Sequence, residues 1–196
     1  MLETFRKIRV HKEIFKFLMA NLVYNDGIET VILMASIFGA QELGFSQGEL
    51  IQCFLMIQGI AFFGALLFGN LADKVTHKKA ISLTLWIYLF VCMWAFFMKT
   101  RKEFWILGAI VGLILGGSQS ASRSLLALFC PKENSAQFFG FFALTQKLAT
   151  VIGPFVFALL SQIFSLRVAV ASLGIFFALG LIILYFVREP LASAKT

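Results

Sequence analysis

The chain has 196 residues, of which 60% are hydrophobic and 24 are phenylalanine, and its formal net charge is +7. A soluble domain of this size cannot bury so much apolar surface, because it has too little interior. Continuous apolar runs of about 20 residues recur along the chain, which predicts an all-α integral membrane protein and excludes a barrel, whose strands alternate in polarity over about ten residues.

The apolar runs predict six transmembrane helices. They lie in a membrane domain over 14–188, between a basic N-terminal lead over 1–13 and a short tail over 189–196. The first run is long, carries polar residues in its middle and is followed by no small-residue cleavage site, so we expect an uncleaved span and not a signal peptide. The expected spans are 14–40, 50–72, 80–98, 104–129, 137–161 and 168–187.

Basic residues are distributed unevenly over the segments between the spans. If the N-terminus is cytoplasmic, the inner segments carry ten Lys and Arg residues, whereas the outer segments carry four: Lys99, Arg101, Lys102 and Arg167. The positive-inside rule then places both ends in the cytoplasm. The same rule explains the net charge, so we expect the lipid bilayer and not nucleic acid as the partner of these residues.

The sequence offers no chemistry for an enzyme. Cys53, Cys92 and Cys130 are odd in number, form no Cys-x-x-Cys pair and have no histidine nearby, so they are interpreted as free thiols. Nucleophile–base pairs, phosphate loops and metal-ligand spacings are not found in the sequence. We therefore expect no catalytic site, no bound metal and no cofactor.

The first span carries a polar turn, Tyr24–Thr30, near the expected midplane of the bilayer. A charged residue at that depth costs at least ~2.5 kcal/mol on insertion scales, so Asp26 and Glu29 suggest a functional role. Their i,i+3 spacing places both on one helix face, and Asn25 is i,i+4 to Glu29. Gly27 between them loosens the helix where a substrate or a neighbouring helix approaches.

Two basic residues, Arg123 in the fourth span and Lys147 in the fifth, lie at similar depths. Three interpretations are open: a structural ion pair such as Asp26 or Glu29 with Lys147, a polar cavity that binds substrate and exchanges protons, or side chains that extend to the membrane surface. On the second interpretation the cavity is lined by Asn25, Asp26, Glu29, Gln119, Arg123, Gln146 and Lys147.

Glycines recur in the outer half of the fourth span. Gly108, Gly112 and Gly116 form a doubled Gly-x-x-x-Gly pattern, which lets another helix backbone approach closely and favours tight packing over a functional role. The polar patches fall in spans one and four, which are matching positions if the helices form two three-helix inverted repeats. Such placement is typical of a transporter site.

The segment between spans two and three reads Gly69-Asn70-Leu71-Ala72-Asp73-Lys74-Val75-Thr76-His77-Lys78-Lys79. It resembles the signature loop of the major facilitator superfamily, Gly-x-Leu-Ala-Asp-Arg/Lys-x-Gly-Arg-Lys. Thr76 replaces a glycine of that pattern and His77 a basic residue. The resemblance implies a gating loop, with a gating role for Asp73 against a neighbouring helix end, formed by Gly69, Asp73, Lys74 and Lys78.

Three segments are more specific: Tyr24–Thr30, Gly116–Ser124, and the stretch from Pro131 through Lys147 to Gly153-Pro154. In this order and spacing they resemble the vacuole-effluxer-like branch of that superfamily, related to fungal autophagy-associated amino-acid effluxers. The resemblance covers nearly the whole chain but only the C-terminal half of a twelve-span protein. It implies alternating-access transport of a small solute, and amino acids are one possibility.

We therefore expect the C-terminal six-helix half of a major-facilitator-type transporter in the bacterial inner membrane. The second half would come from an upstream reading frame, a separate chain or a second copy of this chain, because the rocking of two half-bundles needs both. The alternative is a non-transporting membrane scaffold or assembly subunit, or an inactive remnant of a split transporter.

Overall fold

The computed structural model describes residues 2–130 and 135–189, with side chains from residue 12 onward. Within these ranges the chain forms eight helices and no strand. Six segments are long and apolar enough to cross a membrane, which confirms the predicted all-α fold with six spans. The helices are α1 (Leu2–Leu43), α2 (Gln47–Lys74), α3 (His77–Phe97), α4 (Arg101–Phe129), α5 (Ser135–Leu148), α6 (Ile152–Ile163), α7 (Leu166–Ser172) and α8 (Gly174–Tyr185).

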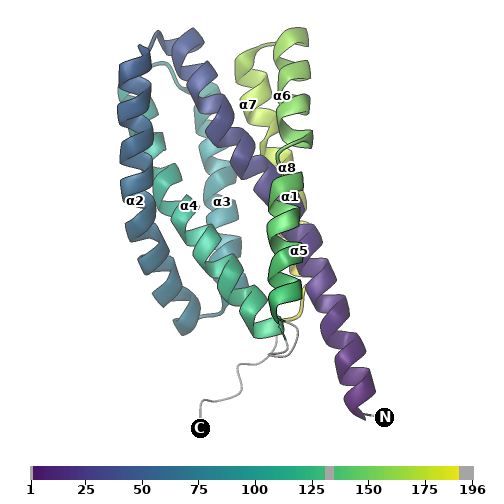
Figure 1. The fold of residues 1–196 in the computed structure, drawn as a ribbon. Coiled ribbons are helices and arrows are strands. Elements are labelled where there is room, and N and C mark those ends of the chain that lie inside the picture. Colours follow the sequence, from purple (N-terminus) through teal and green to yellow (C-terminus); the bar gives the residue numbers. More distant parts are fainter. Residues whose placement is uncertain (1, 131–134, 190–196) are drawn as a thin grey trace.

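The helices differ from the expected spans in two respects. First, α1 begins at Leu2 and includes the basic lead, because no glycine or proline interrupts the chain before Gly27. Second, spans five and six are each divided, into α5 and α6 and into α7 and α8 (Figure 1). The N-termini of α2 and α4 each carry a capping box, formed by Ser46 with Glu49 and by Thr100 with Glu103.

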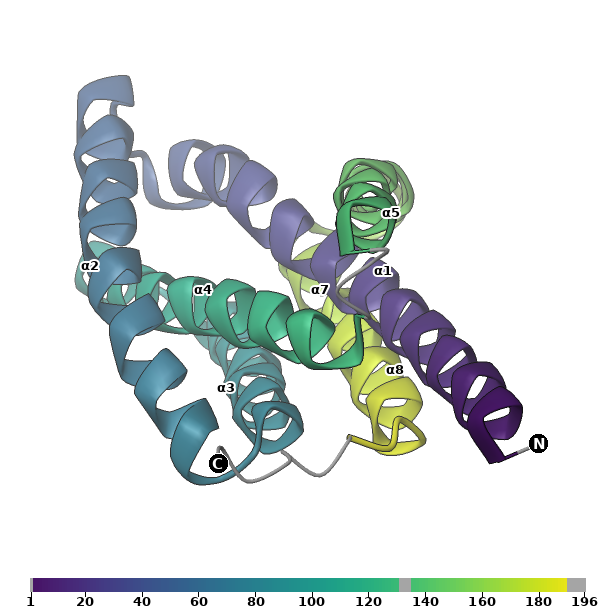
Figure 2. The same ribbon diagram turned by 60° about the horizontal axis from the view of Figure 1, so that its bottom comes forward.

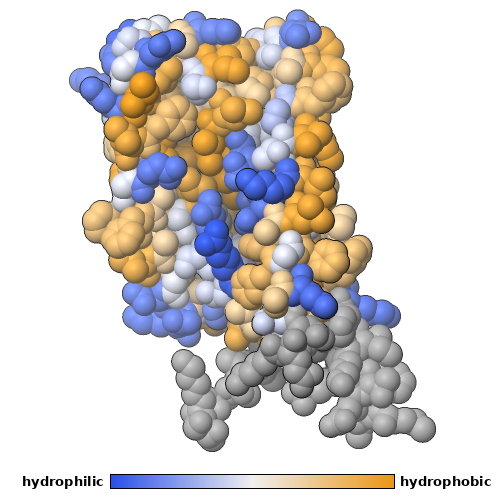
Figure 3. All heavy atoms as spheres, in the orientation of Figure 1, coloured by the Kyte–Doolittle hydropathy of each residue, from blue (hydrophilic) through white to orange (hydrophobic). Residues whose placement is uncertain are grey.

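Figures 1 and 2 show one bundle, in which α1 crosses between α4 on one side and α5 on the other, with α8 beside it. The end of the bundle at which α1 begins is called the inner end, following the charge prediction, and the opposite end the outer end. Hydrophobic residues form a band over the visible face in Figure 3, and hydrophilic residues interrupt this band beside α5.

The closest helix pair is α2 and α4, and glycines form its contact. A Cβ atom on Gly112 would lie 2.7 Å from the Ile57 carbonyl oxygen, and one on Gly116 would overlap the Ala61 carbonyl oxygen. Gly64 of α2 meets the backbone of Leu113 in the same way. The predicted packing role of the glycine pattern in the fourth span is thus confirmed.

Glycines also let α8 approach α1. A Cβ atom on Gly180 would lie 2.7 Å from the Tyr24 Cβ, and one on Gly27 would lie 3.0 Å from the Phe176 Cβ. The Phe177 ring stacks on the Tyr88 ring of α3 with centroids 4.7 Å apart. The polar turn of α1 is therefore held against α8, with its remaining faces turned to α4 and to α5 and α6.

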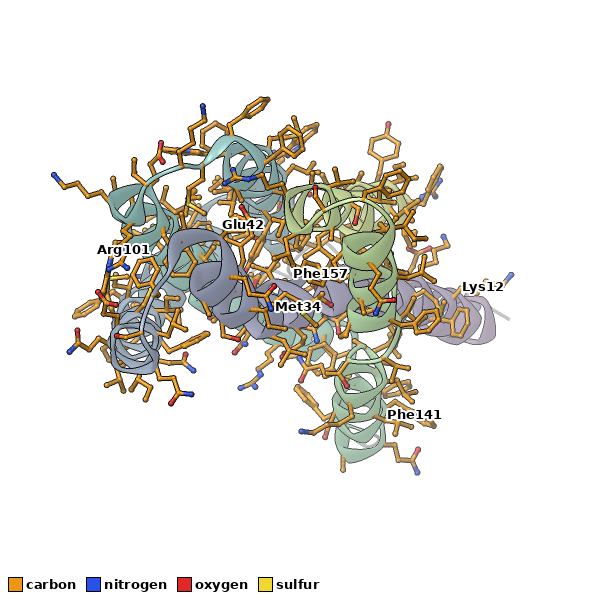
Figure 4. The ribbon with its side chains drawn as sticks, turned by 90° about the horizontal axis from the view of Figure 1, so that it is seen from above. Lys12, Met34, Glu42, Arg101, Phe141 and Phe157 are labelled. Carbon is orange, nitrogen blue, oxygen red and sulfur yellow. The ribbon has the colours of Figure 1, made fainter. Side chains whose placement is uncertain are left out.

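At the outer end, two arginines bind carbonyl groups at the ends of helices. Arg101 donates to the Leu43 carbonyl (3.0 Å) and to that of Gly44, next to the end of α1. Arg167 donates to the Phe96 carbonyl (3.2 Å) at the end of α3 and to Glu42 (3.0 Å). Figure 4 views the bundle from this end and labels Arg101 and Glu42. Two of the four basic residues of the outer segments thus bind carbonyl groups that the ends of α1 and α3 leave without a helical donor.

Candidate functional site

The fifth span breaks at mid-bundle, between the end of α5 at Leu148 and the start of α6 at Ile152. Gly153-Pro154 explains the break. Pro154 has no N–H to donate to the Thr150 carbonyl, and its ring disfavours helical geometry in the residue before it. The Ala149 carbonyl loses its helical donor as well, because the Gly153 N–H points elsewhere.

That N–H donates to the carboxylate of Asp26 on α1, with a distance of 2.8 Å between Gly153 N and Asp26 Oδ2. Asp26 is only 3% exposed, and its carboxylate lies at the N-terminus of α6. A helix N-terminus carries a partial positive charge, so it favours this carboxylate. The side chain of α1 thus caps a helix that belongs to another span.

Gly153 must be a glycine at this contact. The Thr30 hydroxyl oxygen lies where a Cβ on Gly153 would be, and Asp26 Oδ1 would be only 3.0 Å from such a Cβ. Thr30 is itself fixed, because its hydroxyl donates to the Asp26 carbonyl at 2.6 Å. The break in the fifth span and the polar turn of the first span therefore form one close contact.

A second buried polar contact joins α1 to α4. The amide of Asn21 donates to the Tyr24 hydroxyl at 2.8 Å, and the Tyr24 and Ser122 hydroxyls are 2.7 Å apart. The Ser122 hydroxyl donates to the Ser118 carbonyl at 2.5 Å. Because the Ser122 hydroxyl donates its only proton to Ser118, Tyr24 donates to Ser122, and these hydrogen bonds run in one direction from Asn21 to Ser118.

Four buried side-chain atoms have no hydrogen-bond partner among the described residues. They are Asn21 Oδ1, Asn25 Nδ2, Asp26 Oδ1 and Tyr88 OH. Three of the four lie on the polar turn of α1 or one helical turn before it, and Asn25 is only 4% exposed. Native proteins rarely leave buried polar atoms unpaired, so this layer is suited to a polar ligand or water.

The predicted cavity residues on α1 and α5 include one interacting charge pair. Glu29 is half-buried, and Lys147 lies near enough for its charge to act on the Glu29 carboxylate. Lys147 is exposed and Gln146 beside it is half-buried. Among the ion pairs of the described ranges, none joins Asp26 or Glu29 to Lys147 within 4.0 Å. The interpretation as a structural ion pair is therefore not supported by a direct contact.

The two predicted cavity residues of α4 lie toward its inner end. Gln119 is half-buried and Arg123 is exposed, and neither touches Asp26 through a hydrogen bond in the described part of the chain. The structure thus brings Asp26 to α6 and Glu29 towards Lys147. It does not join all seven predicted residues into one hydrogen-bonded cluster.

The predicted gating loop turns at Val75 and Thr76, between α2 and α3. Thr76 is the N-cap of α3 and accepts a hydrogen bond from the Lys79 N–H, so the position where the superfamily has glycine carries a cap. Asp73 has a side chain that is 79% exposed and lies 3.9 Å from His77. Lys74 is exposed, and Gly69 lies beside Ser120 of α4.

Lys78 has a different environment from the rest of the loop. Its ammonium group donates to the Tyr185 and Val187 carbonyls at 2.7 Å each, at the end of α8. Glu189 accepts from the N–H groups of His77 (3.0 Å) and Lys78 (3.1 Å) at the start of α3. We call these contacts the inner clasp; it ties the end of the sixth span to the start of the third.

The outer half of the bundle is apolar where the middle is polar. A cavity of about 80 Å³ lies between α1, α2, α3 and α4, and its walls include Met34, Phe38, Phe54, Met98 and Phe104. Such a cavity is expected to stay dry. The residues that line this cavity, between the polar turn of α1 and the outer end, are thus hydrophobic.

Sequence reasoning missed several residues of this layer. Asn21 lies one helical turn before Asn25, which was a usable signal, whereas the roles of Tyr24, Thr30 and Ser122 depend on partners far away in the sequence. Gly153-Pro154 belongs to a segment that carries the family resemblance, but nothing in the sequence identifies the Gly153 N–H as the partner of Asp26.

The fold and this layer define a class: a polytopic α-helical membrane protein with polar groups and a broken helix at mid-membrane, as in secondary transporters. The family model for vacuole effluxer Atg22-like proteins matches residues 1–194. The chain therefore belongs to that family, and the resemblance to the major facilitator superfamily is confirmed.

Three relatives illustrate the family. The chain is 36% identical over 192 residues to the uncharacterized MFS-type transporter YxiO of Bacillus subtilis (strain 168). The matched region covers 97% of this chain and 45% of the relative. The chain is 28% identical over 178 residues to autophagy-related protein 22 of Saccharomyces cerevisiae (strain ATCC 204508 / S288c), covering 83% of this chain and 33% of the relative. The protein of the same name from Kluyveromyces lactis is 26% identical over 171 residues, covering 82% and 35%. The chain thus spans less than half the length of these relatives.

Proposed function

We propose that this chain is one six-helix half of a major-facilitator-type transporter and moves a small polar solute by alternating access. The observation that carries the proposal is the buried carboxylate of Asp26 at a helix break, in a layer with unpaired Asn21, Asn25 and Tyr88 atoms. Ionisable groups kept at this depth are costly, and in membrane proteins they typically belong to substrate or ion pathways.

The exposed parts of the layer support a second half as partner. Arg123 and Lys147 are exposed on α4 and α5, and Glu29 is half-buried on α1. Figure 3 shows hydrophilic residues that interrupt the hydrophobic band beside α5. Charged side chains at this depth must be shielded from contact with lipid. A second six-helix half, from an upstream reading frame, a separate chain or a second copy, would provide it and would complete the cavity.

The chemistry of the cavity favours a small solute that carries charge or strong hydrogen-bonding groups. Glu29 and Lys147 offer one acid and one base, and Gln119 and Gln146 offer amides beside them. Amino acids, which the family resemblance implies, are the first solutes to test. The bacterial inner membrane and the N-in, C-in orientation remain part of the proposal.

The test is a flux assay in membrane vesicles that contain the chain together with its native partner, with ¹⁴C-labelled neutral, acidic and basic amino acids. We expect Lys147→Met and Glu29→Gln to lower the initial rate at least about tenfold, because each leaves the other charge uncompensated. Lys102→Met is the matched control, since Lys102 is exposed at the outer end. Normal expression with unchanged flux in both variants would refute the cavity role and favour the scaffold alternative.

A further inference from the structure

Within the described part of the chain, no cationic side chain pairs with the Asp26 carboxylate. It takes part in none of the ion pairs of the described residues, and its side chain accepts one hydrogen bond, from the Gly153 N–H. Its second oxygen, Oδ1, is buried without a hydrogen-bond partner among the described residues, and it lies toward the break in the fifth span, 3.0 Å from the place of a Cβ on Gly153. An ionised carboxylate at this depth needs a compensating positive charge.

Several oxygen groups belong to the polar turn and to the break that it contacts. The Thr30 hydroxyl lies between Asp26 and Gly153. The Ala149 carbonyl has lost its helical donor to Asp26, and Ala149 is only 1% exposed. The Thr150 carbonyl has no helical donor either, because residue 154 is proline. One carboxylate, one hydroxyl and two freed carbonyls are thus contributed by two short segments.

This set of groups suits a small monovalent cation. Hard cations take oxygen ligands, and a single carboxylate balances one positive charge, so Ca²⁺ and Mg²⁺ are poorly matched. Carbonyls at an unwound helix are known to coordinate Na⁺ in membrane transporters. A proton on Asp26 would neutralise the carboxylate but could satisfy only one carbonyl, whereas a cation can satisfy all the oxygens together.

We propose that Asp26, Thr30 and the freed carbonyls of Ala149 and Thr150 form a Na⁺ site between α1 and the break in the fifth span. The residue pattern gave no sign of it, because backbone carbonyls supply half of the ligands. Among the described residues no group of three His, Cys, Asp or Glu side chains could hold a metal, so this site differs from the common metal sites. The proposal concerns binding and goes beyond the proposed transport.

The experiment measures binding of ²²Na⁺ to the purified full chain by scintillation proximity, in a buffer with choline as the only other monovalent cation. We expect saturable binding that unlabelled Na⁺ displaces and K⁺ does not. Asp26→Asn should weaken binding at least about tenfold while keeping an amide oxygen for the Gly153 N–H, and Thr30→Val should weaken it several-fold. Glu103→Gln, which changes an acidic residue at the outer end and keeps a side chain that can accept in the capping box, is the matched control and should bind normally.

Folding and binding are separated by the melting temperature in choline, which should be the same for the parent and for Asp26→Asn. A melting temperature that rises with Na⁺ in the parent and not in Asp26→Asn supports the site. Saturable binding that is unchanged in both Asp26→Asn and Thr30→Val would overturn the proposal. So would a parent chain that responds to pH but binds no ²²Na⁺ above background. Because no flux is measured, failure here is distinct from failure of the transport proposal.

Discussion

Two neighbouring parts of this bundle are packed in opposite ways. The helix α4 has fifteen buried residues and touches α2 through glycine backbones, whereas α5 has one buried residue and α6 has two. Figure 4 shows Phe141 of α5 pointing away from the bundle. One pair is thus joined by close-packed backbone, while the fifth span contacts α1 through side chains, such as Phe142 stacked on Phe17, and through the Asp26 contact at its break.

This difference assigns different tasks to the two parts. A contact between backbones cannot adjust without moving whole helices, so α2 and α4 are expected to move as one body. A contact made by the Asp26 carboxylate and one N–H can be changed by a proton, an ion or a solute.

The largest effect is expected from Gly116→Ala. The added Cβ would overlap the Ala61 carbonyl oxygen, which belongs to the backbone and cannot rotate away. We expect a loss of about 3 kcal/mol in the free energy of unfolding, measured by thermal unfolding in detergent. Gly59→Ala is the matched control, because a Cβ at Gly59 meets nothing within 4 Å. Equal melting temperatures for the two variants would contradict the close-packed pair.

Gly153→Ala should have a smaller effect. Its Cβ would displace a side-chain group, the Thr30 hydroxyl, from its hydrogen bond to the Asp26 carbonyl and would weaken the cap from Asp26. We expect a loss of about 1–2 kcal/mol, the typical cost of a lost cap, together with faster proteolysis within residues 149–152. Gly140→Ala in α5 has open space for its Cβ and should behave like the parent. Equal sensitivity in both variants would show that the break is not a specific contact.

Tyr24→Phe tests the joint between α1 and α4. It removes the hydroxyl that links Asn21 to Ser122 and leaves both without that partner. We expect a loss of about 1 kcal/mol in thermal unfolding. Tyr185→Phe changes a tyrosine that is 76% exposed and should leave the melting temperature unchanged. A loss as large as that of Gly116→Ala would mean that hydrogen bonds, and not backbone packing, dominate this side of the bundle.

The smallest effect on stability is expected from Pro154→Ala. The new N–H can donate to the Thr150 carbonyl, so the break should become more helical while the packing of α6 hardly changes. Hydrogen exchange of the peptide that spans residues 149–153 should slow severalfold, with a melting temperature close to that of the parent. Unchanged exchange would show that Gly153 and the Asp26 contact hold the break without the proline.

Much of the fold could be predicted from hydrophobic runs alone. Six spans follow from apolar length, and the packing face of α4 follows from the spacing of Gly108, Gly112 and Gly116, because both depend on local pattern. The division of span five had a signal in Gly153-Pro154. The division of span six at Leu173 had none beyond Gly174, since no proline is nearby.

The site was predictable only in part. A costly charge in an apolar run marks Asp26 without any knowledge of its partner. The partner is a backbone N–H that lies 127 residues away, and a backbone N–H has no residue type to recognise in a sequence. The roles of Glu29, Gln119, Arg123, Gln146 and Lys147 stay predictions, as does the gating role of Asp73.

The inner clasp has a consequence for how the chain assembles during synthesis. The first N–H groups of α3 are capped by Glu189, which follows His77 by 112 residues. Until the ribosome has made the sixth span, those groups must be satisfied by water at the membrane surface. The third span therefore inserts before the N–H groups at its start have their native acceptor. Synthesis of Glu189, after the sixth span, supplies that acceptor and completes the inner clasp.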